Sequence, residues 1–183
     1  MGNLLPSTQN SFKIMMTGID NNVELIPEII EKEDVRETYG LLGMPVLTFE
    51  YKNLLINTWP RNRVTDKEYL MVDANKSYFE GNAGIIFVIN SESMELLDRD
   101  YEYQRKMLDD LLNDEKFKGL PILLIANKQE KDQPVKANEI CEKWDITNII
   151  KNRKWSIMES RSDSKEELTK ALDWLSEQMP KID

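Results

Sequence analysis

The chain segment that begins at Gly18 has the position of a phosphate-binding loop, since it follows an apolar run and precedes a helical pattern. A working loop of the type G-x-x-x-x-G-K-[ST] needs a second glycine, a lysine for the β- and γ-phosphates, and a hydroxyl for Mg²⁺. Those three positions hold Val23, Glu24 and Leu25, and Asp20 lies between them and Gly18. Glu24 replaces a charge-assisted hydrogen bond, which contributes about 1.5–3 kcal/mol, with repulsion between anions. We therefore expect no tight binding of Mg-triphosphate.

The composition limits the classes of partner and of chemistry. The 183 residues suffice for one domain with a full core. A net charge of −9 argues against a nucleic-acid partner and against a strongly anionic membrane surface, because both attract basic patches. The chain has no histidine, which excludes a histidine base, a histidine-dependent triad and a histidine-ligated metal. We predict no metal site.

The single cysteine, Cys141, has no second cysteine in the chain with which to form a disulfide. A chain that cannot form an internal disulfide suits the cytoplasm or another reducing compartment. No apolar run approaches the roughly 18 residues that cross a membrane, and no secretory signal opens the sequence.

Short apolar runs alternate with amphipathic stretches along the chain. The apolar runs predict six strands, at residues 12–17, 46–51, 54–59, 84–90, 121–127 and 155–159. The amphipathic stretches predict helices at residues 96–112, 137–144 and 164–179. The last of these opens with a capping box at Ser164 and Glu167. The alternation indicates a mostly parallel α/β sheet with helices on both faces, and the short link Lys52-Asn53 permits only an antiparallel hairpin.

Five stretches carry motifs along almost the whole chain. They are Met1-Gly2-Asn3, Glu50-Tyr51-Lys52-Asn53, residues 78–88, Ala126-Asn127-Lys128-Gln129-Glu130 and Leu172-Asp173-Trp174-Leu175. In these residues the chain resembles the ADP-ribosylation factor (Arf) and Arf-like family of small GTPases. The resemblance implies a P-loop NTPase-like fold, with a six-stranded, mostly parallel sheet and one antiparallel hairpin. Residues 1–11 would then be an N-terminal segment, and residues 12–183 the Arf-like domain.

Several nucleotide-binding elements that the resemblance implies lack the groups that their chemistry requires. The family's Asp-x-Gly-Gly-Gln, which serves Mg²⁺, the γ-phosphate and the attacking water, corresponds to residues 60–64, Pro-Arg-Asn-Arg-Val. The switch threonine that contacts Mg²⁺ corresponds to Leu41, which has no oxygen to offer a hard cation. The Cys-Ala-Thr that supports the guanine base corresponds to residues 161–163, Arg-Ser-Asp.

The family's guanine-binding motif Asn-Lys-x-Asp is nearly intact, as Asn127, Lys128 and Glu130. Glu130 carries its carboxylate one methylene further out than aspartate, so its hydrogen bonds to guanine require a shift of the base or the loop. Two interpretations stay open. Asn127 and Lys128 hold neighbouring loops together after their strand, or they retain weak binding of guanine.

The resemblance also implies a partner surface, because an apolar triad that contacts effectors in the family corresponds to Met44, Trp59 and Tyr78. Two aromatic residues and a methionine are typical of binding hot spots. The alternative for Trp59 is that it packs under the hairpin in the core.

Gly2 is the acceptor that N-myristoylation requires, and members of the family use it with an amphipathic helix to bind membranes. Here Pro6 interrupts the segment and stands where the lipidation pattern has Ser or Thr. One acyl chain alone gives marginal membrane binding, so we expect at most a weak peripheral contact.

These observations predict an Arf-like pseudo-GTPase without a cofactor, acting as a nucleotide-independent protein-binding module or a fixed subunit of a larger assembly. The first alternative is an enzyme of membrane traffic that binds GTP or GDP with Mg²⁺ weakly and hydrolyses GTP slowly. The second is a lipidated membrane adaptor. In the predicted fold Glu24 comes near Arg61, Arg63 and Arg161, and we expect one of these arginines to pair with it in place of phosphate.

Overall fold

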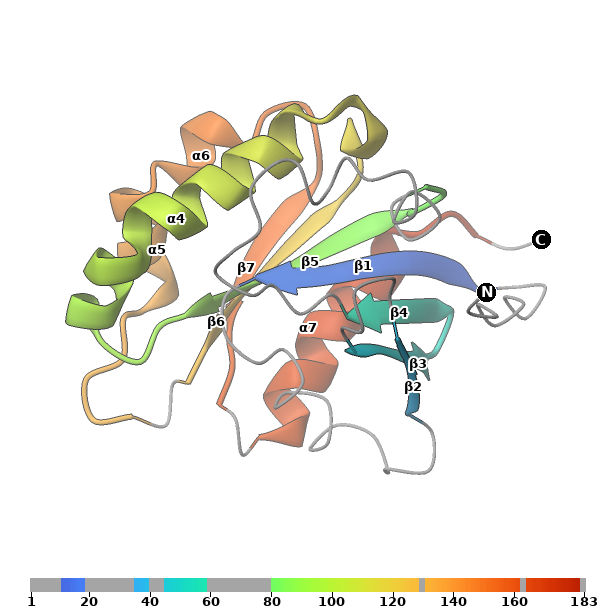
Figure 1. The fold of residues 1–183 in the computed structure, drawn as a ribbon, viewed down its shortest axis with the longest axis horizontal. Helices are drawn as coiled ribbons and strands as arrows, with labels where there is room; N and C mark the ends of the chain where they lie inside the picture. Colours follow the sequence, from blue (N-terminus) through green and yellow to red (C-terminus); the bar gives the residue numbers. More distant parts are fainter. Residues whose placement is uncertain are drawn as a thin grey trace.

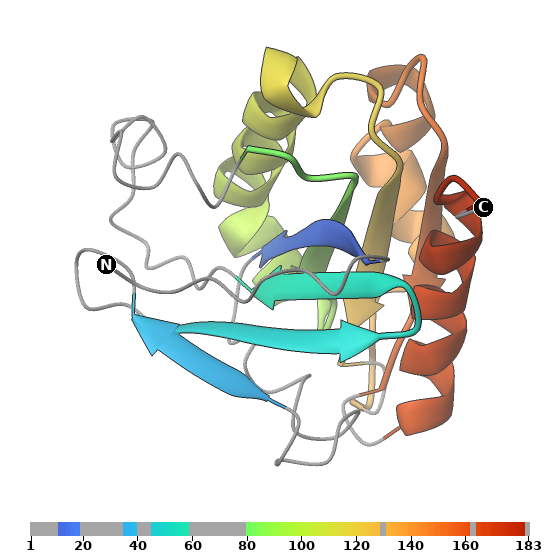
Figure 2. The same cartoon turned by 90° about the vertical axis from the view of Figure 1, so that its right-hand side faces the viewer.

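The computed structural model describes residues 11–18, 35–39, 45–58, 80–128, 131–161 and 164–181. These residues form a seven-stranded sheet with helices on both faces (Figures 1 and 2). The strands lie in the order β2-β3-β4-β1-β5-β6-β7. Their bounds are β1 Phe12–Gly18, β2 Arg36–Tyr39, β3 Pro45–Tyr51, β4 Leu54–Thr58, β5 Gly84–Asn90, β6 Ile122–Asn127 and β7 Trp155–Glu159.

The central part of the sheet is parallel. Strand β1 pairs in parallel with β4 and β5, and β6 pairs in parallel with β5 and β7. Strand β3 is antiparallel to both of its neighbours, β2 and β4. The β3–β4 pair is the hairpin predicted from the link Lys52-Asn53, and Lys52 has the positive φ of 50° that such a tight turn accepts.

The central strands are buried on both faces, which explains their continuous apolar runs. In β5, Ile85, Phe87 and Ile89 belong to one buried apolar cluster, whereas Ile86 and Val88 belong to the other. Strand β6 divides in the same way, since side chains along a strand alternate between the two faces. The sheet therefore separates two cores.

The helices complete these cores, and their bounds are α4 Met94–Asn113, α5 Ala137–Lys143, α6 Ile146–Ile149 and α7 Lys165–Gln178. Helices α4, α5 and α6 supply apolar side chains to one core, and α7 supplies Leu168, Ala171, Leu172 and Leu175 to the other. Figure 1 shows α4, α5 and α6 together over one face of the sheet and α7 over the opposite face.

The N-termini of the two long helices are capped by serines. Ser93 Oγ accepts a hydrogen bond from the Leu96 backbone N–H at 3.2 Å, and Ser164 Oγ accepts one from the Glu167 N–H at 3.4 Å. The predicted capping box at Ser164 and Glu167 forms only in part, because Glu167 Oε2 accepts from the Arg161 N–H at 2.8 Å instead. The side chain of Glu167 thereby ties the end of the β7 segment to α7.

The predicted α/β fold with helices on both faces is confirmed, but the prediction of six strands is wrong by one. The additional strand is β2, Arg36–Tyr39, at the edge of the sheet beside β3. Its residues Arg-Glu-Thr-Tyr show no apolar alternation, so only the pairing with β3 identifies it as a strand. The short helix α6 and the 3₁₀ turn η3, Glu115–Phe117, were also not predicted, since each is too short to show a helical period.

Within the described parts of the chain, none of the helices combines the length and the apolar character needed to cross a membrane. The same residues contain no group of three or more acidic or cysteine side chains able to hold a metal ion. Residues 1–10, including Gly2, lie outside the described residues, as does Trp59, which was predicted to end a strand.

Candidate functional site

The carboxyl ends of the parallel strands meet at one edge of the sheet, where α/β proteins commonly bind ligands. Strands β1, β5, β6 and β7 end there with Gly18, Asn90, Asn127 and Glu159. In the sheet register Gly18 is opposite Val88, and Asn90 is opposite Asn127. Gly18, the start of the predicted phosphate loop, and Asn127, the start of the predicted guanine motif, therefore lie at the same edge of the sheet.

Gly18, the first residue of the predicted phosphate loop, is required by the packing of the sheet. Its φ is +142°, a conformation that residues with side chains rarely adopt. A Cβ at this position would lie 2.1 Å from the carbonyl oxygen of Val88 in β5. Close approach of two strand backbones explains this glycine without a phosphate ligand.

Asn127 and the segment after β5 are joined by hydrogen bonds. The Asn127 carbonyl oxygen accepts from the Ser91 backbone N–H at 3.1 Å and also from the Ser91 hydroxyl. The Asn127 residue is 8% exposed, and its side-chain oxygen Oδ1 has no hydrogen-bond partner among the described residues. The main chain of Asn127 thus has a structural role, whereas its buried side-chain oxygen is not engaged by any of the described residues.

Lys128 follows in a left-handed conformation, with φ of 70°, and its side chain points toward the end of β5. Its Nζ lies 3.6 Å from Glu92 Oε2 in an ion pair whose two side chains are 20% and 33% exposed. The backbone N–H of Glu92 donates to Asn90 Oδ1 at 3.0 Å, which fixes the turn that carries this carboxylate. The interpretation that Asn127 and Lys128 join neighbouring loops is consistent with these contacts.

The carboxylate of Glu159, at the end of β7, contacts the segment that leads into α5. Glu159 Oε1 accepts from the Ala137 backbone N–H at 3.0 Å, and Glu159 Oε2 lies 3.5 Å from Lys136 Nζ. Sequence reasoning missed Ser91, Glu92 and Glu159. The signal available for them was their position at or directly after the ends of strands that meet at this edge.

Most of the predicted site residues lie outside the described residues. They are Gly2, Asp20, Val23, Glu24, Leu25, Leu41, Met44, Trp59, residues 60–64, Tyr78, Glu130, Ser162 and Asp163. The predicted pairing of Glu24 with Arg61, Arg63 or Arg161 therefore stays a prediction. Of these four residues Arg161 is described, and its backbone N–H is used by Glu167.

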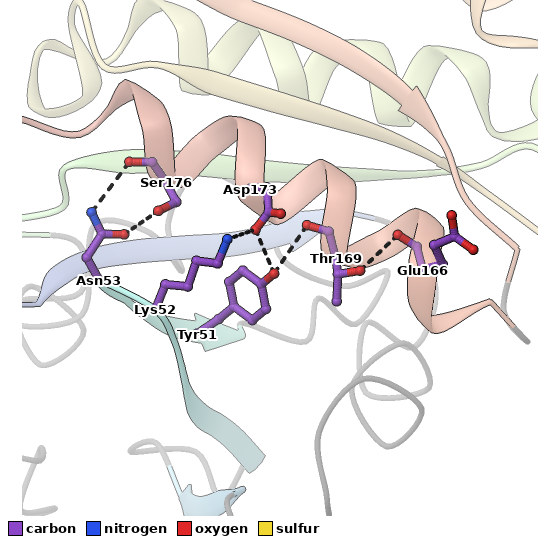
Figure 3. Close-up of polar contacts among 7 residues, drawn as sticks. All are labelled: Tyr51, Lys52, Asn53, Glu166, Thr169, Asp173 and Ser176. Atoms are coloured by element: carbon purple, nitrogen blue, oxygen red, sulfur yellow. Dashed lines mark hydrogen bonds and ion pairs between the residues drawn. The ribbon is translucent and has the colours of Figure 1, made fainter.

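A second polar cluster lies away from this edge, where the tip of the β3–β4 hairpin meets α7 (Figure 3). Tyr51 Oη donates to Asp173 Oδ1 at 2.7 Å, and Lys52 Nζ contacts the same oxygen at 2.5 Å. Ser176 Oγ donates to Asn53 Oδ1 at 2.6 Å. Two of the stretches that carry the resemblance, at residues 50–53 and 172–175, are thus in contact with each other.

These contacts shift the ionisation of both partners. The hydrogen bonds from Lys52 and then Tyr51 hold the pKa of the Asp173 carboxyl below its usual range. Burial, followed by the hydrogen bond to Asp173, raises the pKa of Tyr51 to about 12. At neutral pH the pair is therefore a phenol that donates to a carboxylate.

The similarity to known proteins extends over nearly the whole chain. The model of the ADP-ribosylation factor family matches residues 1–179. ADP-ribosylation factor J of Dictyostelium discoideum is 28% identical over 165 residues, which cover 90% of this chain and 83% of that protein. ADP-ribosylation factor-like protein 1 of Saccharomyces cerevisiae is 27% identical over 184 residues, covering 96% and 95% of the two chains.

A similar fold is found in the Arl6 BBS3 small GTPase from Trypanosoma brucei, whose structure was solved with the nucleotide analogue GppNp bound. The TM-score is 0.69 at 20% sequence identity, and the match covers 91% of this chain and 96% of the other. At 20% identity this similarity is evidence for a shared fold alone.

Proposed function

Because the chain belongs to the ADP-ribosylation factor family, we propose that it is a member that does not switch on a nucleotide. It acts instead as a nucleotide-independent protein-binding module or as a fixed subunit of a larger assembly. The observation that carries this proposal is Glu24, a carboxylate at the position where the phosphate loop requires lysine. An anion at that position repels the β- and γ-phosphates, whereas a lysine attracts them.

The residues at the other nucleotide-binding positions support the same conclusion. Val23 and Leu25 offer neither the glycine backbone nor the hydroxyl of a working loop, and Leu41 has no oxygen for Mg²⁺. Residues 60–64 contain neither the aspartate nor the glutamine that the family uses for Mg²⁺ and water. The side chains at these positions do not fit Mg-GTP.

Internal contacts at the carboxyl edge of the sheet also support the proposal. Lys128 is paired with Glu92, and Glu159 is engaged by Lys136 and the start of α5. The Lys128–Glu92 pair joins the segments that follow β5 and β6, and the contacts of Glu159 join the end of β7 to the start of α5. A folded edge of this kind requires no bound base.

One observation favours a second candidate, weak binding of a guanine nucleotide. Asn127 Oδ1 is buried and has no hydrogen-bond partner among the described residues, and a buried acceptor left unpaired costs free energy that a ligand donor would recover. In this alternative Asn127 and Lys128 would hold the base of GTP or GDP. The phosphates would contribute little to the affinity.

The proposed partner surface consists of Met44, Trp59 and Tyr78. In the sequence Met44 directly precedes β3, and Trp59 directly follows β4. Met44 and Trp59 therefore adjoin, in the sequence, the two strands of one hairpin.

Titration with a fluorescent guanine nucleotide, with and without Mg²⁺, tests the proposed function. We expect no saturable binding tighter than a Kd of about 100 μM and no effect of Mg²⁺, because the interactions with phosphate are lost. Asn127→Ala is the matched variant, since it removes the buried amide of the base motif. Binding in the micromolar range that is lost in Asn127→Ala would establish the second candidate instead, and dependence of that binding on Mg²⁺ would show that the phosphates are bound as well.

A further inference from the structure

Strand β7 forms one outer edge of the sheet, and among the described residues it pairs with β6 alone. The Ile122 N–H donates to the Lys154 carbonyl oxygen at 3.0 Å, and the Ser160 N–H donates to the Ala126 carbonyl oxygen at 2.9 Å. Backbone groups of alternate residues point to the same side of a strand. The N–H and C=O groups that face away from β6 therefore belong to the intervening residues of β7, which are Trp155, Ile157 and Glu159.

Apolar side chains accompany this outer edge on both faces of the sheet. All five residues of β7 are partly exposed. Trp155 and Ile157 pack against the core that α4, α5 and α6 cover, and Met158 packs against the core that α7 covers. Outward-facing backbone groups next to partly exposed apolar side chains are the features by which an extended segment adds to the edge of a sheet.

The two ends of β7 are basic, in a chain whose net charge is −9. Lys151 and Lys154 precede the strand, Arg161 follows it, and all three are exposed. Neither lysine forms an ion pair with another described residue. The acidic residue of the strand, Glu159, is paired with Lys136. The outer side of β7 together with Lys151 and Lys154, termed the β7 edge, is therefore positively charged.

The segment that leads into β7 is held in place by Arg153. Its Nη1 donates to the Phe117 carbonyl oxygen at 3.0 Å, and its Nη2 donates to the Leu112 carbonyl oxygen at 3.1 Å. These hydrogen bonds attach the segment to η3 and to the last turn of α4. The backbone of the β7 edge is therefore ordered before any partner binds, which lowers the entropic cost of binding.

We propose that the β7 edge binds an extended acidic segment of a partner protein, which adds to the sheet as a further strand. The main chain of the segment pairs with Trp155 and Ile157, and its carboxylates lie beside Lys151 and Lys154. A second copy of this chain is a poor occupant, because lysines at a strand edge oppose the pairing of two like edges. An acidic strand converts that repulsion into attraction.

This surface goes beyond the proposed function, since it depends neither on the phosphate loop nor on the partner surface proposed above. Strands β1, β5 and β6 lie between β7 and the β3–β4 hairpin. A family member that binds a nucleotide could use the β7 edge equally well.

An array of synthetic peptides, titrated against the full chain, tests the proposal. Each peptide has about six residues, a typical strand length, and alternates glutamate with varied apolar residues. Matched peptides carry lysine in place of glutamate. We expect the best glutamate peptides to bind about tenfold more tightly than their lysine counterparts, and to bind more weakly as salt is added, because exposed charges are screened.

Hydrogen exchange distinguishes strand addition from attraction to the lysines alone. A bound glutamate peptide should slow exchange of the Trp155 and Ile157 amides, whose N–H groups face outward. The amides of Ser156 and Met158 face β6, so their exchange should change little.

Charge reversal tests the two lysines. Lys151→Glu/Lys154→Glu should weaken binding of the glutamate peptides by about tenfold. Lys106→Glu/Lys131→Glu is the matched control, because it makes the same change in net charge at two exposed lysines of α4 and of the segment after β6. The control should leave the affinity nearly unchanged.

Ile157→Pro tests the backbone contact. It removes an N–H that faces away from β6, so the hydrogen bonds between β6 and β7 keep their donors, and we expect no saturable peptide binding. Ile157→Ala is the matched control, since it also loses packing in the core but keeps the N–H, and it should retain binding. Thermal unfolding establishes that both variants are folded; if the proline variant is not, the exchange pattern and the charge reversal decide.

Four results would overturn the proposal: no saturable binding by any glutamate peptide, equal binding of glutamate and lysine peptides, undiminished binding in folded Ile157→Pro, or self-association of the chain that protects the Trp155 and Ile157 amides. The last result would make a second copy the occupant. A guanine nucleotide found in the purified chain would contradict the proposed function and leave the β7 edge unaffected.

Discussion

Replacing Gly18 with alanine is expected to lower the free energy of unfolding by about 3–5 kcal/mol. The new Cβ would lie 2.1 Å from the Val88 carbonyl oxygen and 2.7 Å from the Val88 nitrogen, so the backbones of β1 and β5 must separate. The positive φ of +142° adds strain of its own. Since a domain of this size is stable by roughly 5–15 kcal/mol, thermal or urea unfolding will detect the loss.

Gly81→Ala is the matched control for this prediction. Gly81 also has a positive φ, +73°, but a Cβ there would meet nothing within 4 Å. Its substitution reports the conformational strain alone, which we expect to be about 1 kcal/mol. Equal losses of stability in the two variants would show that Gly18 is not kept for the contact between β1 and β5.

Replacing Trp59 with alanine is expected to weaken partner binding by about 2–4 kcal/mol, roughly 30- to 1,000-fold in Kd. The expectation follows from the proposed surface, in which Trp59 is a hot-spot side chain that becomes buried on binding. Quantitative pull-down from native extract, with the wild type and Trp59→Ala, measures the difference in partner recovery. The recovery should not change when GTP or GDP is added.

The competing interpretation is that Trp59 packs in the core, where its loss would cost about 3–5 kcal/mol of folding stability. Both proteins must therefore unfold at similar temperatures before their partner recovery is compared. Met94→Ala is the control for loss of an exposed apolar side chain, because Met94, at the start of α4, is 39% exposed. Equal recovery by the wild type and Trp59→Ala would move the interface elsewhere.

The fold follows from patterns that are local in the sequence. The apolar runs of β5 and β6 predict strands buried on both faces, and the link Lys52-Asn53 predicts the hairpin, because two residues leave no room for a crossover. Strand β2 escaped prediction because Arg-Glu-Thr-Tyr becomes a strand only through its pairing with β3. Pairing at a sheet edge is a tertiary property, which outweighs local propensity.

The candidate site is less accessible to sequence reasoning, because its contacts join residues far apart in the chain. Asn127 and Lys128 were identified by their motif, but their partners Ser91 and Glu92 precede them by 36 residues and meet them only through the register of β5 and β6. The contact of Tyr51 with Asp173 spans 122 residues in the same way. Such pairings depend on the order of the strands in the sheet.

The nucleotide content of the purified chain tests the central claim most directly. The chain is purified without added nucleotide, denatured by heat, and the supernatant is analysed by chromatography for GTP and GDP. Because Glu24 stands in place of the loop lysine, the account predicts far less than one guanine nucleotide per chain. A content near one GTP or GDP per chain would contradict it and identify the chain as a nucleotide-binding member of its family.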